Sequence, residues 1–108
     1  MFGFSLGTGE DVDGDGANDL AVSTWGPDLV ALFQGNSSLL TSDHDRADAW
    51  AVYRSDAGTG TFGVSVALLG DLDDDGFGEV LIGDSRLDDE GAAWLFYGDG
   101  VGGEYSTT

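Results

Sequence analysis

The chain lacks cysteine and lysine entirely, and it contains a single proline among its 108 residues. The absence of cysteine excludes disulfides, thiolate metal sites and cysteine nucleophiles. Basic residues are also scarce: 3 arginines stand against 21 acidic residues, which gives a formal net charge of −18 at pH 7. Nothing here neutralises phosphate groups, so neither nucleic acid nor an anionic membrane surface is expected as a partner. Divalent cations are the natural counterions, and a salt-adapted surface is a second, compatible interpretation.

Long hydrophobic runs are missing as well. No stretch approaches the length of a membrane span, so membrane insertion is not expected. Residues 1–9 carry neither the basic nor the apolar segment of a signal peptide. Three alternatives stay open: the signal was removed, the chain is an excerpt, or the protein is intracellular. Glycine is abundant, with 19 residues, and the apolar runs are short, which predicts strands and turns rather than helices.

An internal repeat organises the chain. Phe62 matches Phe2 and Asp71 matches Asp11, so the two blocks share an offset of 60 positions. Each copy reads Phe-Gly-x-Ser, then an aspartate-rich loop, then an acidic residue followed by an apolar run. A constant offset across separate blocks is typical of repeat architectures. It divides the chain into a first unit, residues 1–61, and a second unit, residues 62–108.

Each unit is expected to consist of short strands. Runs such as residues 92–97 are apolar at almost every position, which indicates sheets that are covered on both faces. Residues 36–48 are polar and are predicted to form a surface loop. The expected strands are residues 2–8, 20–24, 29–34 and 49–54 in the first unit, and residues 62–69, 80–84 and 92–97 in the second, with 104–107 as a short fourth strand.

The residues that carry chemistry lie in two loops of the form D-x-D-x-D-G-x-x-[DE], residues 11–19 and 71–79. Ca²⁺ takes six to eight oxygen ligands at roughly 2.3–2.6 Å, and alternate residues of a tightly wound loop can direct carboxylates at one centre. The glycine at the sixth position permits the sharp turn. The sequence therefore predicts two Ca²⁺ sites. The expected ligands are the carboxylates of Asp11, Asp13, Asp15 and Asp19 with the Ala17 carbonyl, and the carboxylates of Asp71, Asp73, Asp75 and Glu79 with the Phe77 carbonyl.

The crowding of acids favours metal binding over an ordinary turn. Four carboxylates on a short loop repel one another, so cation binding and local folding are expected to be coupled. One such loop would be explained as an Asp/Gly-rich turn, but two at matching positions favour a metal. Mg²⁺ suits the loops less well because it retains its waters. An EF-hand is excluded, because its bidentate Glu at position 12 is replaced by Val22 and Ile82.

These motifs resemble the FG-GAP repeat of integrin α-subunit propellers and related bacterial surface proteins. The resemblance covers about residues 2–35 and 62–98 and rests on the Phe-Gly pairs and the calcium loops, while the Gly-Ala-Pro half of the motif is absent. It implies an all-β fold of two tandem antiparallel four-stranded blades of a β-propeller, one in residues 1–61 and one in residues 62–108. It also implies an extracellular or cell-surface adhesion or structural role, with calcium stiffening the blades.

Two blades are too few for a closed propeller, which needs about 4–8. The large residues Trp50, Tyr53, Trp94 and Phe96 are expected on bare blade faces, and exposed apolar patches normally mark association. The chain is then an excerpt of a longer propeller, or copies close into a ring, or copies stack into an open filament. The shortened tail of the second unit favours assembly into a homo-oligomer or polymer, since a neighbouring chain could donate the missing edge strand of the second blade.

Two functional hypotheses follow. The first is a non-enzymatic, calcium-stabilised structural or adhesion module that self-assembles. The second is a ligand-binding fragment of a larger integrin-like cell-surface propeller, with a protein or glycan ligand. No catalytic residue is expected, because no nucleophile elbow, nucleotide loop or supported His/Asp/Ser constellation is present. Single residues receive the plainer interpretations: His44 as a solvated loop residue, Asp88-Asp89-Glu90 as a hairpin tip, and Trp25, Trp50 and Trp94 as packing between blades rather than a sugar platform.

Overall fold

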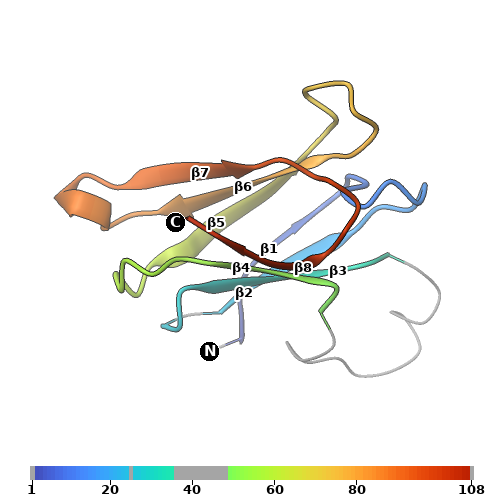
Figure 1. Cartoon of the computed structure of the whole chain (residues 1–108). Coiled ribbons are helices and arrows are strands. Elements are labelled where there is room, and N and C mark those ends of the chain that lie inside the picture. Colours follow the sequence, from blue (N-terminus) through green and yellow to red (C-terminus); the bar gives the residue numbers. More distant parts are fainter. Residues whose placement is uncertain (1, 25, 36–48, 108) are drawn as a thin grey trace.

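The computed structural model describes residues 2–24, 26–35 and 49–107 (Figure 1). The prediction of an all-β chain is confirmed, because this described part holds eight strands and one short 3₁₀ turn. The elements in chain order are β1 (Phe2–Thr8), β2 (Leu20–Thr24), β3 (Leu29–Phe33), β4 (Ala51–Arg54), β5 (Phe62–Leu69), β6 (Glu79–Asp84), η3 (Leu87–Asp89), β7 (Ala92–Phe96) and β8 (Gly103–Ser106).

The strands form two sheets that lie one over the other (Figure 1). The first sheet has the order β1-β2-β3-β4-β8, and the second has the order β5-β6-β7. Consecutive strands within each sheet pair antiparallel, whereas β8 runs parallel to β4. Apart from β8, the two stacked sheets are antiparallel and each comes from one repeat, which agrees with neighbouring blades of a partial propeller.

The fourth strand of the second unit lies elsewhere than the sequence suggests. The first unit has its four antiparallel strands, but residues 104–107, expected to complete the second unit, overlap β8 and extend the first sheet. Contacts with β4 explain this position. The ring of Tyr105 stacks on Tyr53 with centroids 5.2 Å apart, and the Gly103 N–H donates to the Trp50 carbonyl at 3.0 Å. Within the described residues, the second sheet therefore has three strands with β7 at its edge.

The Phe-Gly pairs of the two units share one backbone conformation. Gly3 and Gly63 have φ values of +89° and +90°, which favour glycine, and each lies where its strand shifts register against the next strand. Space also requires glycine at position 63, because a Cβ there would lie 3.0 Å from side-chain atoms of Ser23 and Val30. The repeat in sequence is thus a repeat in structure, and the second copy of the pair packs on the first sheet.

The main hydrophobic core lies between the sheets, and Trp50, Trp94 and Phe96 pack against it. Tyr53 is buried there and meets Phe96 edge-to-face with ring centroids 4.9 Å apart. The expectation that these four residues lie on bare faces is wrong, whereas the core-packing interpretation of Trp50 and Trp94 holds. A run that is apolar at every position does not reveal which residues point inward. The buried core residues are Val12, Ala21, Val30, Leu32, Ala51, Tyr53, Phe62, Leu68, Val80 and Ile82.

Buried acids fix the second sheet on the first. The Asp28 carboxylate accepts the N–H of Phe62 at 3.1 Å. The Asp84 carboxylate accepts the hydroxyls of Thr61 at 2.6 Å and Thr59 at 2.7 Å. Burial alone would raise the pKa of Asp84, but these hydrogen bonds outweigh it and hold the pKa below its usual value. The connector between the units is therefore anchored at both sheets.

Several predictions concern residues outside the described part: the surface loop at residues 36–48, His44 within it, and Trp25. The acidic segment at residues 88–90 lies in the β6–β7 connection with η3, as a hairpin tip should. Among the described residues, no helix has the length and apolar character needed to cross a membrane.

Candidate metal centres

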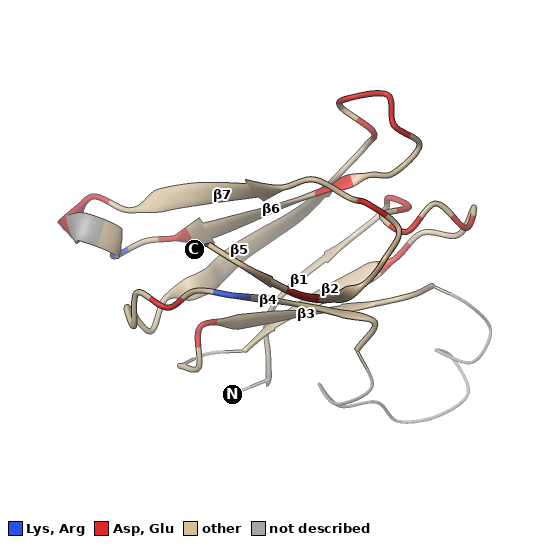
Figure 2. Ribbon diagram, viewed as in Figure 1, with Lys and Arg blue, Asp and Glu red and all other residues tan. Residues whose placement is uncertain are grey.

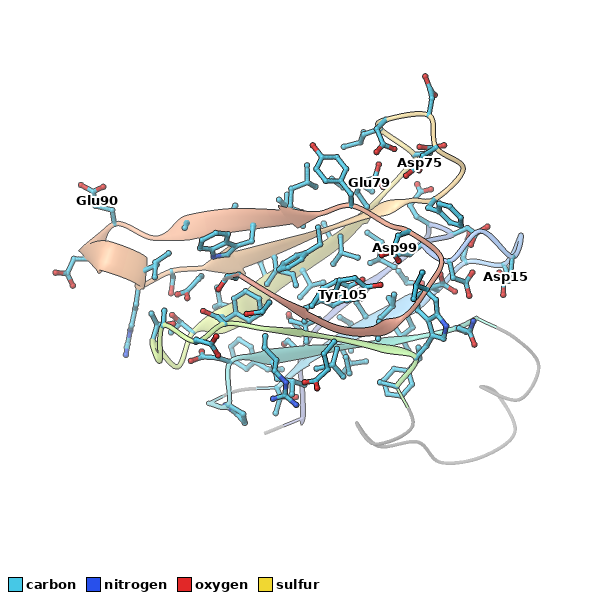
Figure 3. All side chains as sticks on the ribbon, in the orientation of Figure 1. Asp15, Asp75, Glu79, Glu90, Asp99 and Tyr105 are labelled. Carbon is cyan, nitrogen blue, oxygen red and sulfur yellow. The ribbon has the colours of Figure 1, made fainter. Side chains whose placement is uncertain are left out.

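The two aspartate-rich loops lie at the same end of the molecule. The first joins β1 to β2 and the second joins β5 to β6. Figure 2 shows acidic residues on both loops, and Figure 3 places Asp15, Asp75 and Glu79 at this end. Stacking of the sheets brings the loops into direct contact, because the Gly78 N–H donates to the Asp11 carbonyl at 2.9 Å.

Asp11 shapes the turn of the first loop. Its carboxylate accepts the N–H groups of Gly14 at 2.8 Å, Asp15 at 3.2 Å and Gly16 at 2.7 Å. Burial raises the pKa of Asp11, but the amide hydrogen bonds, that of Gly16 first, outweigh it and leave the pKa below its usual value. Asp11 is therefore ionised at neutral pH, as a metal ligand must be.

Asp19 closes the first loop from its other end. The side chain is buried, and its carboxylate accepts the N–H groups of Val12 at 2.8 Å, Asp13 at 3.2 Å and Gly35 at 2.9 Å. These three amides come from the start of the loop and from the segment after β3. Asp19 thus braces the loop against the first sheet, in addition to occupying the ninth position of the motif.

Asp13 and Asp15 complete the cluster. Asp13 accepts the Gln34 side-chain amide at 2.6 Å, a contact that sequence reasoning missed, and Asp15 accepts the Ala17 N–H at 2.9 Å. Desolvation raises the pKa of Asp13 to about 6, with further upward contributions from neighbouring carboxylates and opposing hydrogen bonds from Gln34 and the Asp15 N–H. A bound cation would relieve the smaller upward contributions that the neighbouring carboxylates make to this pKa.

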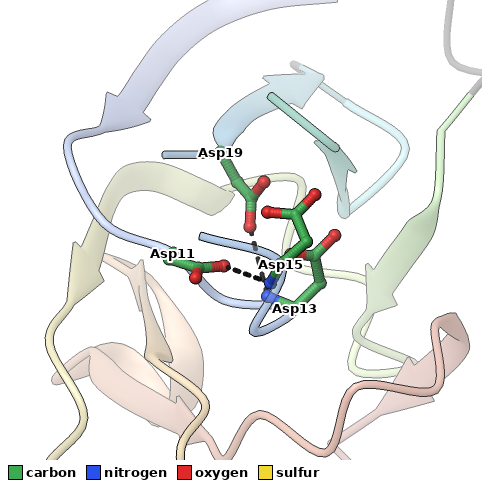
Figure 4. A group of neighbouring side chains, drawn as sticks. All are labelled: Asp11, Asp13, Asp15 and Asp19. Atoms are coloured by element: carbon green, nitrogen blue, oxygen red, sulfur yellow. Dashed lines mark hydrogen bonds between the residues drawn. The ribbon is translucent and has the colours of Figure 1, made fainter. Parts of the chain in front are cut away.

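The first cluster has dimensions that fit a calcium ion (Figure 4). One oxygen each from Asp11, Asp13, Asp15 and Asp19 lies within 4.8 Å of the others. Oxygens at roughly 2.3–2.6 Å from one Ca²⁺ lie at most about 5 Å apart, whereas the tighter Mg²⁺ shell brings them within about 4 Å. An all-carboxylate donor set also suits a hard divalent cation.

The second loop repeats this turn with a smaller cluster. Asp71 accepts the N–H of Gly76 at 2.8 Å, and this bond is the main cause that lowers the pKa of Asp71. Oxygens of Asp71, Asp73 and Glu79 lie within 4.8 Å of one another, and Asp75, the fourth predicted carboxylate, is not part of that group. The pKa of Asp73 is raised to about 6, by desolvation first and then by Asp75 and Glu79.

Glu79 takes the place that Asp19 has in the first loop. It is fully buried, and it accepts the N–H groups of Leu72 at 2.8 Å and Gly98 at 3.3 Å. The amides are equivalent to two of those that Asp19 holds: the second residue of the loop and a residue that follows the third strand. The extra methylene of glutamate is therefore accommodated without a change in these partners.

The predicted carbonyl ligands, Ala17 and Phe77, occupy equivalent positions in the two turns. Each donates its own N–H to the aspartate two residues earlier, and both of these hydrogen bonds measure 2.9 Å. The peptide at the seventh position is thus held in the same way in both loops. Coordination by the two carbonyls stays a prediction.

Two glycines that follow the third strand of each unit were missed by sequence reasoning. A Cβ at Gly35 would lie 1.6 Å from the carbonyl oxygen of Asn18, and one at Gly98 would lie 2.3 Å from that of Gly78. Only glycine lets these N–H groups reach the buried acid of each loop. A signal was present, because each glycine stands two residues after a phenylalanine: Phe33-Gln34-Gly35 and Phe96-Tyr97-Gly98.

No protein family model matches the chain. The chain is similar to a segment of integrin alpha-PS2 from Drosophila melanogaster, with 33% identity over 119 aligned residues. The similarity covers 94% of this chain and 8% of that protein, so the chain spans less than a tenth of the length of the relative it matches. With the all-β fold and the two acidic clusters, this similarity supports an integrin-like module.

Proposed function

We propose that the chain is a calcium-binding module of integrin-like β-propeller type, with one Ca²⁺ site in each unit. The observation that carries the proposal is the pair of carboxylate clusters at equivalent positions of the repeat. The first site comprises the carboxylates of Asp11, Asp13, Asp15 and Asp19 and the Ala17 carbonyl. The second comprises those of Asp71, Asp73, Asp75 and Glu79 and the Phe77 carbonyl, with Asp75 moving inward when the ion binds.

Calcium in this proposal has a structural role. Each loop connects the first two strands of a sheet, and the loops touch each other through the hydrogen bond from Gly78 to Asp11. An ion that neutralises the carboxylates removes their mutual repulsion and stiffens this end of both sheets. The module is non-enzymatic and acts in adhesion or structure at the cell surface or outside the cell, a role supported by its similarity to an integrin α subunit.

The outer face of the second sheet supports self-assembly. Leu81 pairs with Leu95 on this face, as Ala21 pairs with Leu32 in the first sheet. Ala21 and Leu32 are completely buried beneath the second sheet, whereas Leu95 is 38% exposed. The second sheet covers this face of the first unit, but no other described strand covers the corresponding face of the second unit. A ring or open filament of copies would cover it, together with the edge of β7.

The alternative function is a ligand-binding fragment of a larger integrin-like propeller, with a protein or glycan as ligand. The similarity favours it, because the chain matches only 8% of the integrin subunit. Size in solution with calcium separates the two: rings or polymers support self-assembly, and a monomer supports the fragment.

Calcium titration by isothermal calorimetry tests the metal proposal. We expect two Ca²⁺ per chain in the unmodified protein and one in the variant Asp11→Asn. Val101→Ser serves as the control because Val101 is 75% exposed and belongs to neither cluster; it should retain both sites. A protein without any heat of calcium binding, or an Asp11→Asn variant that still binds two ions, would contradict the proposal.

A further inference from the structure

The second loop carries an aromatic residue that lies against the first loop. At the seventh position of the motif, unit one has Ala17 and unit two has Phe77. A Cβ built on Gly14 would lie 2.7 Å from the Phe77 ring, so the ring packs directly on the backbone of the first loop. Gly14 stands between Asp13 and Asp15, two proposed ligands of the first site.

The same ring also packs against the segment after β7. A Cβ at Gly100 would come within 2.6 Å of the Phe77 ring, and a Cβ at Gly98 within 2.9 Å of the Cβ of Phe77. The ring therefore contacts both the first loop and the β7–β8 connection. Glycines in both segments leave the space that the ring fills.

The peptide after Phe77 makes a second contact with the first loop. The Gly78 N–H donates to the carbonyl of Asp11, the first residue of that loop, at 2.9 Å. A side chain at position 78 would lie 2.8 Å from the same oxygen, which explains glycine there. Phe77 and Gly78 thus link the two loops: the Phe77 carbonyl is a proposed ligand of the second site, while the Phe77 ring and the Gly78 N–H contact the first loop.

We infer that Phe77 is a positioning residue for the first metal site and couples the two sites. The inference rests on the proposed function. When the Phe77 carbonyl is fixed by an ion in the second loop, its ring and the Gly78 N–H are fixed as well. The first loop then loses less conformational freedom on binding its own ion. Repulsion between the two ions opposes this effect and is weakened by salt at physiological ionic strength. We expect the ordering effect to exceed the repulsion, which makes the coupling positive.

Site-specific titration tests the coupling. The amide resonances of Gly16 and Gly76 report separately on the two loops as Ca²⁺ is added to the full chain at physiological ionic strength. We expect Asp71→Asn, which weakens the second site, to reduce calcium affinity at Gly16 about five-fold or more, within the usual range for coupled sites. Phe77→Ala should reduce it similarly. The double variant should lose little more, because the ring transmits the effect.

Matched variants separate positioning from a general loss of structure. Leu72→Ala shortens a 61% exposed apolar residue of the same loop and should leave affinity at Gly16 unchanged. Phe77→Leu keeps apolar bulk at the position and should restore part of the affinity. If Phe77→Ala fails to fold, Asp71→Asn, whose side chain is exposed, still decides whether the sites are coupled, and Phe77→Leu tests the role of the ring.

The outcomes distinguish this inference from the proposal beneath it. Two responding loops with unchanged affinity at Gly16 in Asp71→Asn would overturn the coupling and leave calcium binding intact. In a second outcome, both loops respond and Asp71→Asn lowers the calcium affinity measured at Gly16. If this decrease is the same with Phe77 and in the Phe77→Ala background, the role of Phe77 is overturned. No response at either glycine would overturn both.

Discussion

The acidic residues of the two loops have different structural roles, although the motif does not distinguish between them. Asp19 and Glu79 are buried and hold backbone amides from two parts of the chain, whereas Asp15 and Asp75 are exposed at the turn. The buried pair shapes the loop whether or not an ion is bound. In the function proposed here, the exposed pair serves mainly to bind the metal.

Substitution of Asp19 should therefore differ from substitution of Asp15. Asp19→Ala leaves the N–H groups of Val12 and Gly35 without their acceptor, and unsatisfied buried groups cost about 1–3 kcal/mol each. We expect it to lower the free energy of unfolding by about 2 kcal/mol or more in EDTA. Asp15→Ala should change that value little while weakening calcium binding. Urea denaturation in EDTA measures the difference, and equal values for the two variants would contradict it.

The raised pKa values of Asp13 and Asp73 predict a pH-dependent calcium effect. Both pKa values lie at about 6, so protons compete with the ion as pH falls below that value. Without calcium, the stability of the protein depends on pH in the opposite direction. The contribution of these two groups to the free energy of unfolding is full below pH 3.8 and is lost as pH rises through 6. Calcium should therefore increase Tm more at pH 7.5 than at pH 5, as measured by differential scanning calorimetry. A calcium shift that is independent of pH would contradict this account.

At the scale of elements, the segment after the third strand is a constant part of each unit. The Gly35 N–H donates to the buried Asp19 carboxylate, and the Asn18 carbonyl leaves no room for a Cβ at position 35. Gly35→Ala should push this segment away and lower Tm, with loss of calcium affinity at the first site. Gly70→Ala is the matched control, since a Cβ there meets only the Glu10 carboxylate at 3.7 Å. Equal Tm values for the two alanine variants would refute the requirement for glycine.

If copies assemble through the outer face of the second sheet, which carries Leu81 and Leu95, a charge on that face should prevent the assembly. Leu95→Glu places a charge on that face, whereas Val101→Glu adds the same charge to an exposed connection. We expect light scattering after size-exclusion chromatography to show large species for the unmodified chain and Val101→Glu, and smaller species for Leu95→Glu. Assemblies of unchanged size in Leu95→Glu would exclude this face as the contact.

The sequence predicts strands and loop motifs well because both depend on local signals. The offset between the repeats locates β1, β2, β5 and β6, and the periodic aspartates locate the clusters. The sequence does not predict the placement of β8, because the pairing of β8 with β4 depends on the stacking of Tyr105 on Tyr53, which are far apart in the chain. It also misplaces Trp94 and Phe96, since continuous apolar runs conceal which face is inward.

At the scale of the whole molecule, the chain has a net charge of −18, and the stacking of its two sheets brings both acidic loops together at one end. In the function proposed here, divalent cations neutralise the carboxylates of both loops, which touch through the hydrogen bond from Gly78 to Asp11. Bound calcium would then also reduce the electrostatic repulsion between copies in an assembly.

The most direct measurement is an experimental structure of the chain crystallised in millimolar calcium, with anomalous diffraction to identify the ions. Our account predicts one calcium in each loop, roughly 2.3–2.6 Å from the oxygens of the first and second clusters. Two loops without anomalous density, and with the side chains of Asp13 and Asp73 turned towards solvent, would contradict it.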